Sequence, residues 1–256
     1  MKIKEFLLFL LFSIICFCSF SLKKHPYVER SSIDFDKKWD LVWNDEFRSA
    51  SSIDDNWIVQ NASPKHILSS RWKENIEVRN GCVVFNNRKE NRGGKEWTTG
   101  SMTCKKQFQY GFFECKMKIS AAYGTNNSFW FYQWNKNDTL KSFEIDVVEG
   151  HYPNDMNSTL HNHGIRGTKK KTTFSNHFYE KDLSKEFHIY GLLWDVDSLK
   201  FYLDGIQVWS IQNSCCFQPA NMVLGTAVLK NTKKKITDEI DGTSMIVDYV
   251  RVWKLK

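Results

Sequence analysis

The sequence has few of the residues that break a fold and few signals for long helices. Only 4 prolines and 13 glycines occur among 256 residues, and no low-complexity tract is present, which argues against intrinsic disorder over most of the chain. No stretch longer than about ten residues carries the 3.6-residue apolar stripe of an amphipathic helix. No internal repeat and no linker between two domains is evident. The hydrophobic fraction of 41% is enough for one proper core.

The longest apolar run lies at the start of the chain and is shorter than a membrane span. It covers Leu7–Phe20, whereas a transmembrane helix needs about 20 apolar residues. Lys2 and Lys4 precede it. Ser19 and Ser21 are the small residues expected at positions −3 and −1 of a signal-peptide cleavage site after Ser21. We therefore expect residues 1–21 to be a signal peptide, residues 22–38 a short polar lead-in and residues 39–256 a single domain. The protein is then extracellular, periplasmic or at the cell surface.

The cysteines fit neither a zinc motif nor a complete set of disulfides. Seven are present, and Cys16 and Cys18 fall in the expected signal, where bulky neighbours disfavour a lipid anchor. The other five have no zinc-ligand spacing. One bridge between Cys104 and Cys115 is conceivable, but we favour five free, mostly buried thiols, because strand cysteines often act as small apolar residues. These five are Cys82, Cys104, Cys115, Cys215 and Cys216.

The formal net charge of +7 does not indicate a nucleic-acid partner. The basic runs at 169–171 and 233–235 contain no aromatic residue, whereas single-stranded nucleic acid is bound by basic residues interleaved with stacking aromatics. Both runs are better explained as solvated loops. A mild preference for an anionic polymer is compatible with this charge.

Past residue 38 the sequence predicts strand after strand. Residues 113–120 alternate between apolar and polar, the pattern of a half-buried strand. Asn-Gly at 80–81 and Asp-Gly at 204–205 each separate two such runs and predict two-residue hairpins. Residues 245–253 are apolar in both phases, as in a strand buried on both sides. Strands without intervening helices favour an all-β sandwich of antiparallel sheets over βαβ units.

One predicted strand contains three acids, in the run FEIDVVE. Glu144 and Asp146 are two positions apart and share a face. A regular strand would send Glu149 to the opposite, buried face, where a lone carboxylate is costly. A β-bulge at Val147-Val148 would add one residue and return Glu149 to the face of Glu144, and such bulges are common beside active sites.

Three carboxyl groups on one face cannot all be ionised cheaply, so at least one pKa must rise. One acid that keeps its proton beside one that stays charged is what glycosidic bond cleavage requires. The two outer Glu side chains could lean to the separation of about 5–5.5 Å that retaining glycosidases use. The alternative is a solvated strand face paired with Lys and Arg, but Glu and Asp are poor strand formers.

The chain resembles glycoside hydrolase family 16 in this motif and in its surroundings. That family carries its catalytic residues on one strand as Glu-x-Asp-x-(x)-Glu, and EIDVVE is the bulged form. LVWNDEF at 41–47, YGFFECKMKI at 110–119, the segment at 188–209 and MIVDYVRVWKL at 245–255 look like further strands of the family, in the family's order.

The resemblance implies a curved jelly-roll β-sandwich, here residues 39–256 as one catalytic domain, with a substrate cleft across its concave face. It implies retaining hydrolysis of internal β-linkages in a polysaccharide, with Glu144 as nucleophile, Asp146 as helper acid and Glu149 as general acid/base. No cofactor is required for this chemistry. The expected partner is a polysaccharide or oligosaccharide, bound by a monomer.

The family often binds a structural calcium ion on the convex side. The matching positions are Asp248, Glu46 and the backbone of Gly81. An equally simple interpretation is that Asp248 caps a turn or pairs with Arg251.

The resemblance also suggests which residues contact sugar, because the apolar faces of sugars stack on aromatic rings. The segment NSFWFYQW aligns with the cleft strand of the family, where Asn127 opens the run and Trp130 matches a cleft Trp. Trp134 and Trp97 are further candidates. Core packing is the alternative for each Trp.

A His-x-His pair follows the acidic strand. Side chains two apart on a strand share a face, so His161 and His163 could bind a metal, with His151 and His66 as further ligands. No spacing completes a closed ligand set. The family places a His at this point, so we interpret His161, and with it His163, as cleft residues.

Two other functions remain open on the same fold. A non-catalytic carbohydrate-binding protein would have no need of the three acids, whereas a transglycosylase would use them with a sugar as acceptor. A β-glucan or a galactan is the expected substrate, and the sequence does not distinguish these two from a host glycan. The cleft strand lacks the Trp-Pro entry common in laminarin-cleaving members, and the loop GIRGTKKKTTFSNHF is distinctive.

Overall fold

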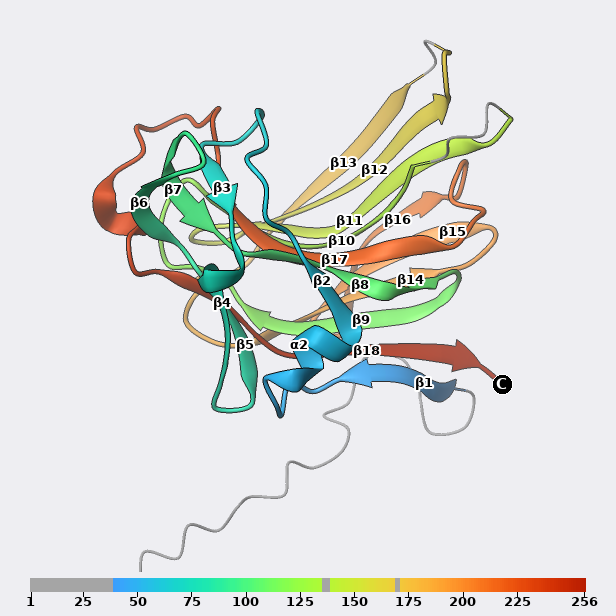
Figure 1. Cartoon of the computed structure of the whole chain (residues 1–256). Helices are drawn as coiled ribbons and strands as arrows, with labels where there is room; N and C mark the ends of the chain where they lie inside the picture. The colour runs from blue at the N-terminus through green and yellow to red at the C-terminus, as the bar shows by residue number, and fades with distance from the viewer. Residues whose placement is uncertain (1–38, 135–138, 169–170) are drawn as a thin grey trace, which may run out of the picture.

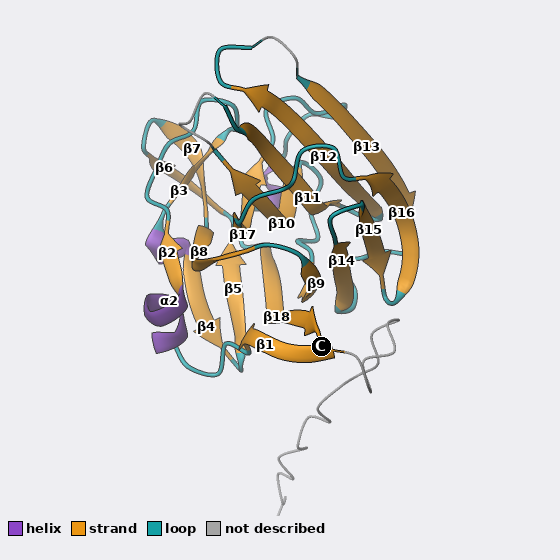
Figure 2. Cartoon of the chain, turned by 90° about the vertical axis from the view of Figure 1, so that its right-hand side faces the viewer, coloured by secondary structure: helices purple, strands orange, loops and turns teal. Residues whose placement is uncertain are grey.

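The computed structural model describes residues 39–134, 139–168 and 171–256. The expected signal peptide and lead-in lie outside the described residues. Two large antiparallel sheets pack face to face, and a small third sheet closes one end (Figures 1 and 2). No helix in the described ranges is long and apolar enough to cross a membrane. The predicted all-β jelly-roll sandwich is confirmed.

The first sheet has eight strands, and the last strand of the chain lies at its centre. Seven of them lie in the spatial order β16 (Ile206–Gln212), β15 (Ser198–Leu203), β14 (His188–Trp194), β9 (Gly111–Lys118), β18 (Ser244–Leu255), β5 (Cys82–Asn86) and β4 (Ile76–Arg79). The eighth strand, β1 (Trp39–Asp45), lies outside this order and pairs with β18.

The second sheet has seven strands and carries the acidic run on its central region. In spatial order these are β13 (Thr172–Tyr179), β12 (Asp155–Ile165), β11 (Lys141–His151), β10 (Thr125–Gln133), β17 (Ala220–Val228), β8 (Ser101–Phe108) and β2 (Trp57–Val59). The small sheet has the order β3 (Ser69–Arg71), β7 (Lys95–Thr99) and β6 (Arg88–Arg92). The helical pieces are α2 (Ser51–Asn56), η1 (Lys73–Asn75) and η2 (Asp238–Ile240).

Both predicted hairpins are present. β4 and β5 are joined by Asn80 and Gly81, with φ of 55° and 73°, and β15 and β16 by Asp204 and Gly205, with φ of 47° and 89°. Two successive residues with positive φ give the turn whose twist suits a hairpin.

The core lies between the two sheets, directly beneath the acidic strand. Phe113 and Trp194 of the first sheet meet Phe131 and Phe143 of the second, with centroid separations of 4.9 Å for Phe113–Phe131 and 5.9 Å for Phe143–Trp194. All four side chains are fully buried. This aromatic layer fixes the inner face of β11, so the outer face of that strand is rigidly presented. The five cysteines of the described chain are free, as favoured from the sequence.

Candidate active site

The acidic strand β11 is interrupted by the predicted bulge. Asp146 pairs with Thr159 on β12 and Glu149 pairs with Asn157, so three steps on β11 match two steps on β12. The extra residue lies at Val147-Val148, and both of these side chains are fully buried. The bulge therefore turns Glu149 to the same face as Glu144 and Asp146.

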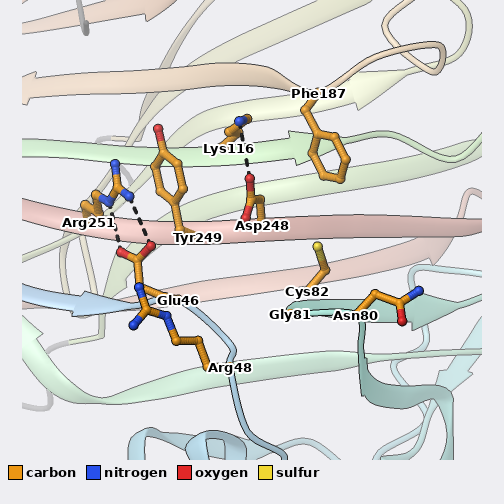
Figure 3. A pocket seen from close by; sticks show the side chains of 10 residues that line it. All are labelled: Glu46, Arg48, Asn80, Gly81, Cys82, Lys116, Phe187, Asp248, Tyr249 and Arg251. Atoms are coloured by element: carbon orange, nitrogen blue, oxygen red, sulfur yellow. Dashed lines mark hydrogen bonds and ion pairs between the residues drawn. The ribbon is translucent and has the colours of Figure 1, made fainter. Parts of the chain in front are cut away.

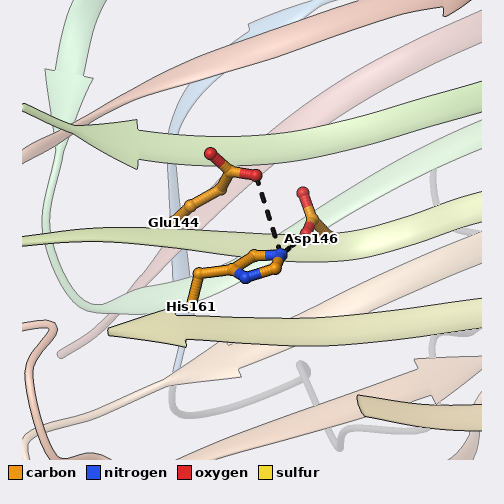
Figure 4. A group of neighbouring side chains, drawn as sticks. All are labelled: Glu144, Asp146 and His161. Carbon is orange, nitrogen blue, oxygen red and sulfur yellow. Dashed lines mark ion pairs between the residues drawn. The ribbon is translucent and has the colours of Figure 1, made fainter. Parts of the chain in front are cut away.

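Glu144, Asp146 and His161 form the centre of this face (Figure 4). His161 Nε2 lies 3.3 Å from Asp146 Oδ2 and 3.9 Å from Glu144 Oε1. His161 Nδ1 lies 3.0 Å from Thr173 Oγ1, which fixes the plane of the ring. His163 Nε2 approaches Glu144 Oε2 at 3.8 Å. Both histidines of the His-x-His pair thus face the expected nucleophile.

Asp146 is the most buried of the three acids, with 5% of its surface exposed. Burial raises its pKa from 3.8 to about 7, and the charges of Glu149 and Glu144 act in the same direction, against the hydrogen bond from His161. The hydrogen bond to Asp146 in turn raises the pKa of His161. Near neutral pH the pair can therefore hold a proton close to Glu144.

Glu149 is held by two amide groups. Asn126 Nδ2 donates to Oε1 at 2.6 Å, and Asn157 Nδ2 donates to Oε2 at 2.9 Å. One amide comes from β10 and the other from β12, the two neighbours of β11. The carboxyl group of Glu149 is thus oriented from both sides, as an acid that must deliver a proton to one atom requires.

An aromatic row follows the Glu144 end of the cleft. Trp130, Tyr132 and Trp134 alternate along β10 and beyond it, with centroid separations of 5.3 Å and 6.1 Å. Trp134 is 50% exposed and contacts the ring of His163 at 4.5 Å, and His163 stacks on His161 at 5.6 Å. These exposed rings offer the flat apolar surface on which sugars stack.

Three basic side chains also line the cleft. His66, Arg71 and Lys230 line the same hollow as Trp130 and the three acids. Arg71 donates from Nη1 to Gln60 Oε1 at 2.7 Å, and its buried Nε has no hydrogen-bond partner. No carboxylate of the described residues pairs with Arg71, and burial lowers its pKa. No motif in the sequence singled out this cation.

Two of the expected sugar-contacting residues lie elsewhere. Trp97 is 5% exposed and packs with Ala122, Val228 and Ile240 in a separate cluster under the small sheet. Asn127 is fully buried. Its Oδ1 accepts from the backbone and hydroxyl of Ser120, and its Nδ2 donates to Gly150 O at 2.9 Å. The expectation that Trp97 and Asn127 contact substrate is therefore wrong, because neither side chain reaches the cleft.

The residue that does reach the acids is the neighbour of Asn127. Trp130 lies on the cleft face, so the alternation of β10 places Asn126 and Ser128 on that face and Asn127 on the other. The same rule applied backwards from His161 identifies Asn157 on β12. Both amides were missed, although period-2 counting from residues already chosen would have found them.

The acids and His161 also satisfy the spacing of a cation site. One ligand atom each of Glu144, Asp146 and His161 lie within 4.8 Å of one another. The other histidines considered as ligands do not join them: His151 Nδ1 lies 3.6 Å from Asp155, and His66 lines the hollow without joining the cluster. The hydrogen bond between His161 and Asp146 accounts for the cluster as a proton-sharing pair.

The residues expected to hold calcium meet in a hollow on the other sheet (Figure 3). Glu46, Gly81 and Asp248 all line it, but each carboxylate already has a cation. Arg251 donates to both oxygens of Glu46, at 2.9 Å and 3.0 Å, and Lys116 Nζ lies 3.3 Å from Asp248 Oδ2. Calcium needs six to eight oxygen ligands. The residues therefore do not fit a calcium ion in this arrangement.

Comparison with known proteins agrees with the fold. The family model described as Beta-porphyranase A-D, GH16 domain, matches residues 39–255. The clotting factor G alpha subunit of Tachypleus tridentatus is 27% identical over 252 residues, which cover 90% of this chain and 36% of that protein. This chain thus spans about a third of the length of that relative. The beta-glucanase of Rhodothermus marinus is 24% identical over 255 residues and is covered to 85%.

A solved structure has the same fold. The endo-beta-1,3-glucanase from Pyrococcus furiosus superposes with a TM-score of 0.75 at 24% identity, covering 88% of this chain and 98% of that one. Since the family model extends over nearly the whole described chain, the protein belongs to glycoside hydrolase family 16.

Proposed function

We propose that the chain is an exported, retaining endo-β-glycosidase that cleaves internal β-linkages of a polysaccharide. The observation that carries this proposal is the bulged strand β11, which brings Glu144, Asp146 and Glu149 to one face of an open cleft. Glu144 is the nucleophile and Glu149 the general acid/base. Aromatic rings and basic side chains along the cleft suit a polymer that crosses the sheet.

The reaction proceeds in two displacements. In the first, an oxygen of Glu144 attacks the anomeric carbon, the glycosidic C–O bond breaks, and the proton of Glu149 passes to the leaving oxygen. In the second, Glu149 takes a proton from water, the water oxygen attacks the anomeric carbon, and Glu144 is released. Asp146 and His161 keep a proton close to Glu144, which limits the repulsion between the acids while the charge of Glu144 changes.

For the substrate we propose a porphyran-type galactan, with a β-glucan as the second candidate. The porphyranase-type family model supports the galactan, and so does Arg71, a cation without a carboxylate partner in the described chain, which could meet an anionic group on the polymer. The β-glucanases among the relatives support the glucan. We further propose that the enzyme acts as a monomer.

The test is product release from a panel of porphyran, agarose, carrageenan, laminarin, mixed-linkage glucan and mucin glycans. Purified protein beginning at residue 22 should release short oligosaccharides from one of them, and Glu144→Gln should release none while keeping the same thermal unfolding temperature. Undiminished activity of Glu144→Gln would refute the nucleophile assignment.

Two rivals are resolved by the same experiment. Binding of a polymer by both proteins without cleavage would favour a non-catalytic carbohydrate-binding protein. Products longer than the substrate supplied would favour a transglycosylase, in which an acceptor sugar replaces water. Retention is checked by the anomer released first, since double displacement returns the β-configuration.

A further inference from the structure

The floor of the cleft continues beyond the catalytic strand onto the edge strand β13. Asn157, Thr159 and His161 of β12 pair with His177, Ser175 and Thr173 of β13. Hydrogen bonds join side chains across this register, between Thr159 and Ser175 at 3.3 Å and between His161 and Thr173 at 3.0 Å. Since paired residues share a face, β13 presents Thr173, Ser175, His177 and Tyr179 to the same side as the acids.

This column ends in a pair of exposed, parallel rings. His177 and Tyr179 stack with centroids 6.2 Å apart and an interplanar angle of 11°. The side chain of His177 is 47% exposed, and Tyr179 is 63% exposed. The two carboxylate oxygens of Asp155 lie 3.0 Å and 3.1 Å from His177 Nδ1 and hold this ring in place. Asp155 also lies 3.6 Å from His151 Nδ1. The pair therefore presents two exposed parallel rings to water, one of them held by Asp155, and neither ring belongs to the core.

The position of the pair relates it to one end of the reaction. Glu149, Asn157 and His177 lie in one row across β11, β12 and β13, so His177 is two strand spacings, about 10 Å, from the backbone of Glu149. Glu144 belongs to a different row, through His161 to Thr173. The acid/base protonates the leaving oxygen, so sugars beyond the cleaved bond extend from the Glu149 row.

We propose that His177 and Tyr179 form a stacking platform for the leaving-group side of the polysaccharide, beyond the sugar next to the cleaved bond. The platform rests on the proposed function, and it adds a specific binding subsite to it. Its ligand is a sugar ring with an apolar C–H face, which buries against the two rings while the Tyr179 hydroxyl remains free to bond a sugar hydroxyl. Trp134 and His163 serve the Glu144 end, so the enzyme holds the chain on both sides of the cut.

The strand itself offers a matched control. Phe174 lies on β13, is 45% exposed and pairs with the core-facing Leu160, so it belongs to the opposite face. Phe174→Ser removes an exposed ring of the same edge strand without touching the cleft floor. Tyr179→Ala removes the platform ring, and Tyr179→Phe keeps the ring and loses only the hydroxyl.

The experiment measures kcat/KM on porphyran and laminarin and on a short aryl β-glycoside of the polymer that is cleaved. Tyr179→Ala should lower kcat/KM on the polymer about three- to tenfold, mainly through KM, as loss of one aromatic stacking contact predicts. The aryl substrate, which has no sugar beyond the cleaved bond, should be affected less. Tyr179→Phe should recover most of the loss, and Phe174→Ser should match the unmodified protein.

Binding in the absence of turnover gives a second readout. In the Glu144→Gln background, retardation in native gels containing porphyran or laminarin should weaken with Tyr179→Ala and not with Phe174→Ser. If the unmodified enzyme cleaves a polymer but Tyr179→Ala behaves like Phe174→Ser in both assays, the platform is refuted and the glycosidase stands. If no polymer is cleaved or bound by any of these proteins, the proposed function fails and the platform with it.

Discussion

A single buried carboxyl group, Asp146, determines how charge is distributed among the acids. It lies between Glu144 and Glu149 on the strand and is the only one of the three that is largely withdrawn from water. The outer two acids can then take opposite roles, one as a charged nucleophile and the other as a proton donor, because the acid between them does not add a full charge.

The first prediction concerns this titration. The unfolded chain releases the proton of an Asp near pH 3.9, whereas folded Asp146 keeps it up to about 7. Stability is therefore lost as pH rises through this window. The raised pKa of His161 acts in the same direction. The Tm of Asp146→Asn, relative to the unmodified protein, should rise from pH 4 to pH 7. The difference between the two melting curves removes the contribution of Glu114, whose pKa burial also raises to about 7. A difference that is flat with pH would contradict the assignment.

The second prediction concerns the amides on Glu149. Glu149 acts as a proton donor, and removing a hydrogen bond between neutral groups costs about 0.5–1.5 kcal/mol, so Asn157→Ala should lower kcat/KM on the polymer roughly 2- to 12-fold. The loss should be smaller on an aryl glycoside with a good leaving group, because that substrate needs little protonation. Equal losses on both substrates would show that Asn157 supports the cleft in general and does not act through Glu149.

At the scale of elements, β10 shows how much strand alternation decides. The sequence correctly predicted the bulge in β11 and both hairpins, because each has a local signature in its acids or its turn residues. It also correctly predicted a strand over residues 245–253, but burial on both faces of that strand was wrong, because one face of β18 is only half-buried. The composition of NSFWFYQW does not separate the two faces of β10, since both phases contain polar and aromatic residues. Only the choice of Trp130 as a cleft residue separates them, and it places Asn127 on the opposite face. No alternation of apolar and polar residues around Trp97 indicated whether its side chain faces the cleft or the core. Its burial depends on residues as distant in sequence as Ile240, and the edge strand β13 gave no sign that it shares the cleft floor.

The third prediction follows from the corrected role of Asn127. Its side chain joins β10 to Ser120 and to Gly150, the residue after the acid/base. Asn127→Ala leaves these buried groups without partners, at about 1–3 kcal/mol for each unsatisfied group. We expect a lower Tm with little change in KM for the polymer. A raised KM at an unchanged Tm would restore Asn127 to the cleft.

At the scale of the whole molecule, the two sheets have separate tasks. The seven-stranded sheet carries the acids and the cleft, and the eight-stranded sheet supports its inner face through the shared aromatic layer. The hollow between β1, β5 and β18 belongs to the supporting sheet. Burial is the largest single influence on the pKa of Glu46 and raises it. The hydrogen bond and charge of Arg251, together with Asn44 and Arg48, outweigh burial, so the pKa is lowered. The ion pair between Glu46 and Arg251 thus joins the end of β1, the first strand along the chain, to β18, the last.

The fourth prediction tests whether these ion pairs take the place of a metal. Because Lys116 and Arg251 neutralise Asp248 and Glu46, adding EDTA or calcium chloride should leave the Tm of the unmodified protein unchanged. Lys116→Met removes the cation beside Asp248 and frees a carboxylate beside the Gly81 turn. This variant should have a lower Tm without calcium and regain part of the loss with it, as expected when an ion binds only the folded state. Lys73→Met, which removes an exposed lysine paired with Asp54, is the matched control and should not respond to calcium. A fall in the Tm of the unmodified protein on adding EDTA would show that calcium competes successfully with Lys116 for Asp248, and that the first and last strands are joined through the metal.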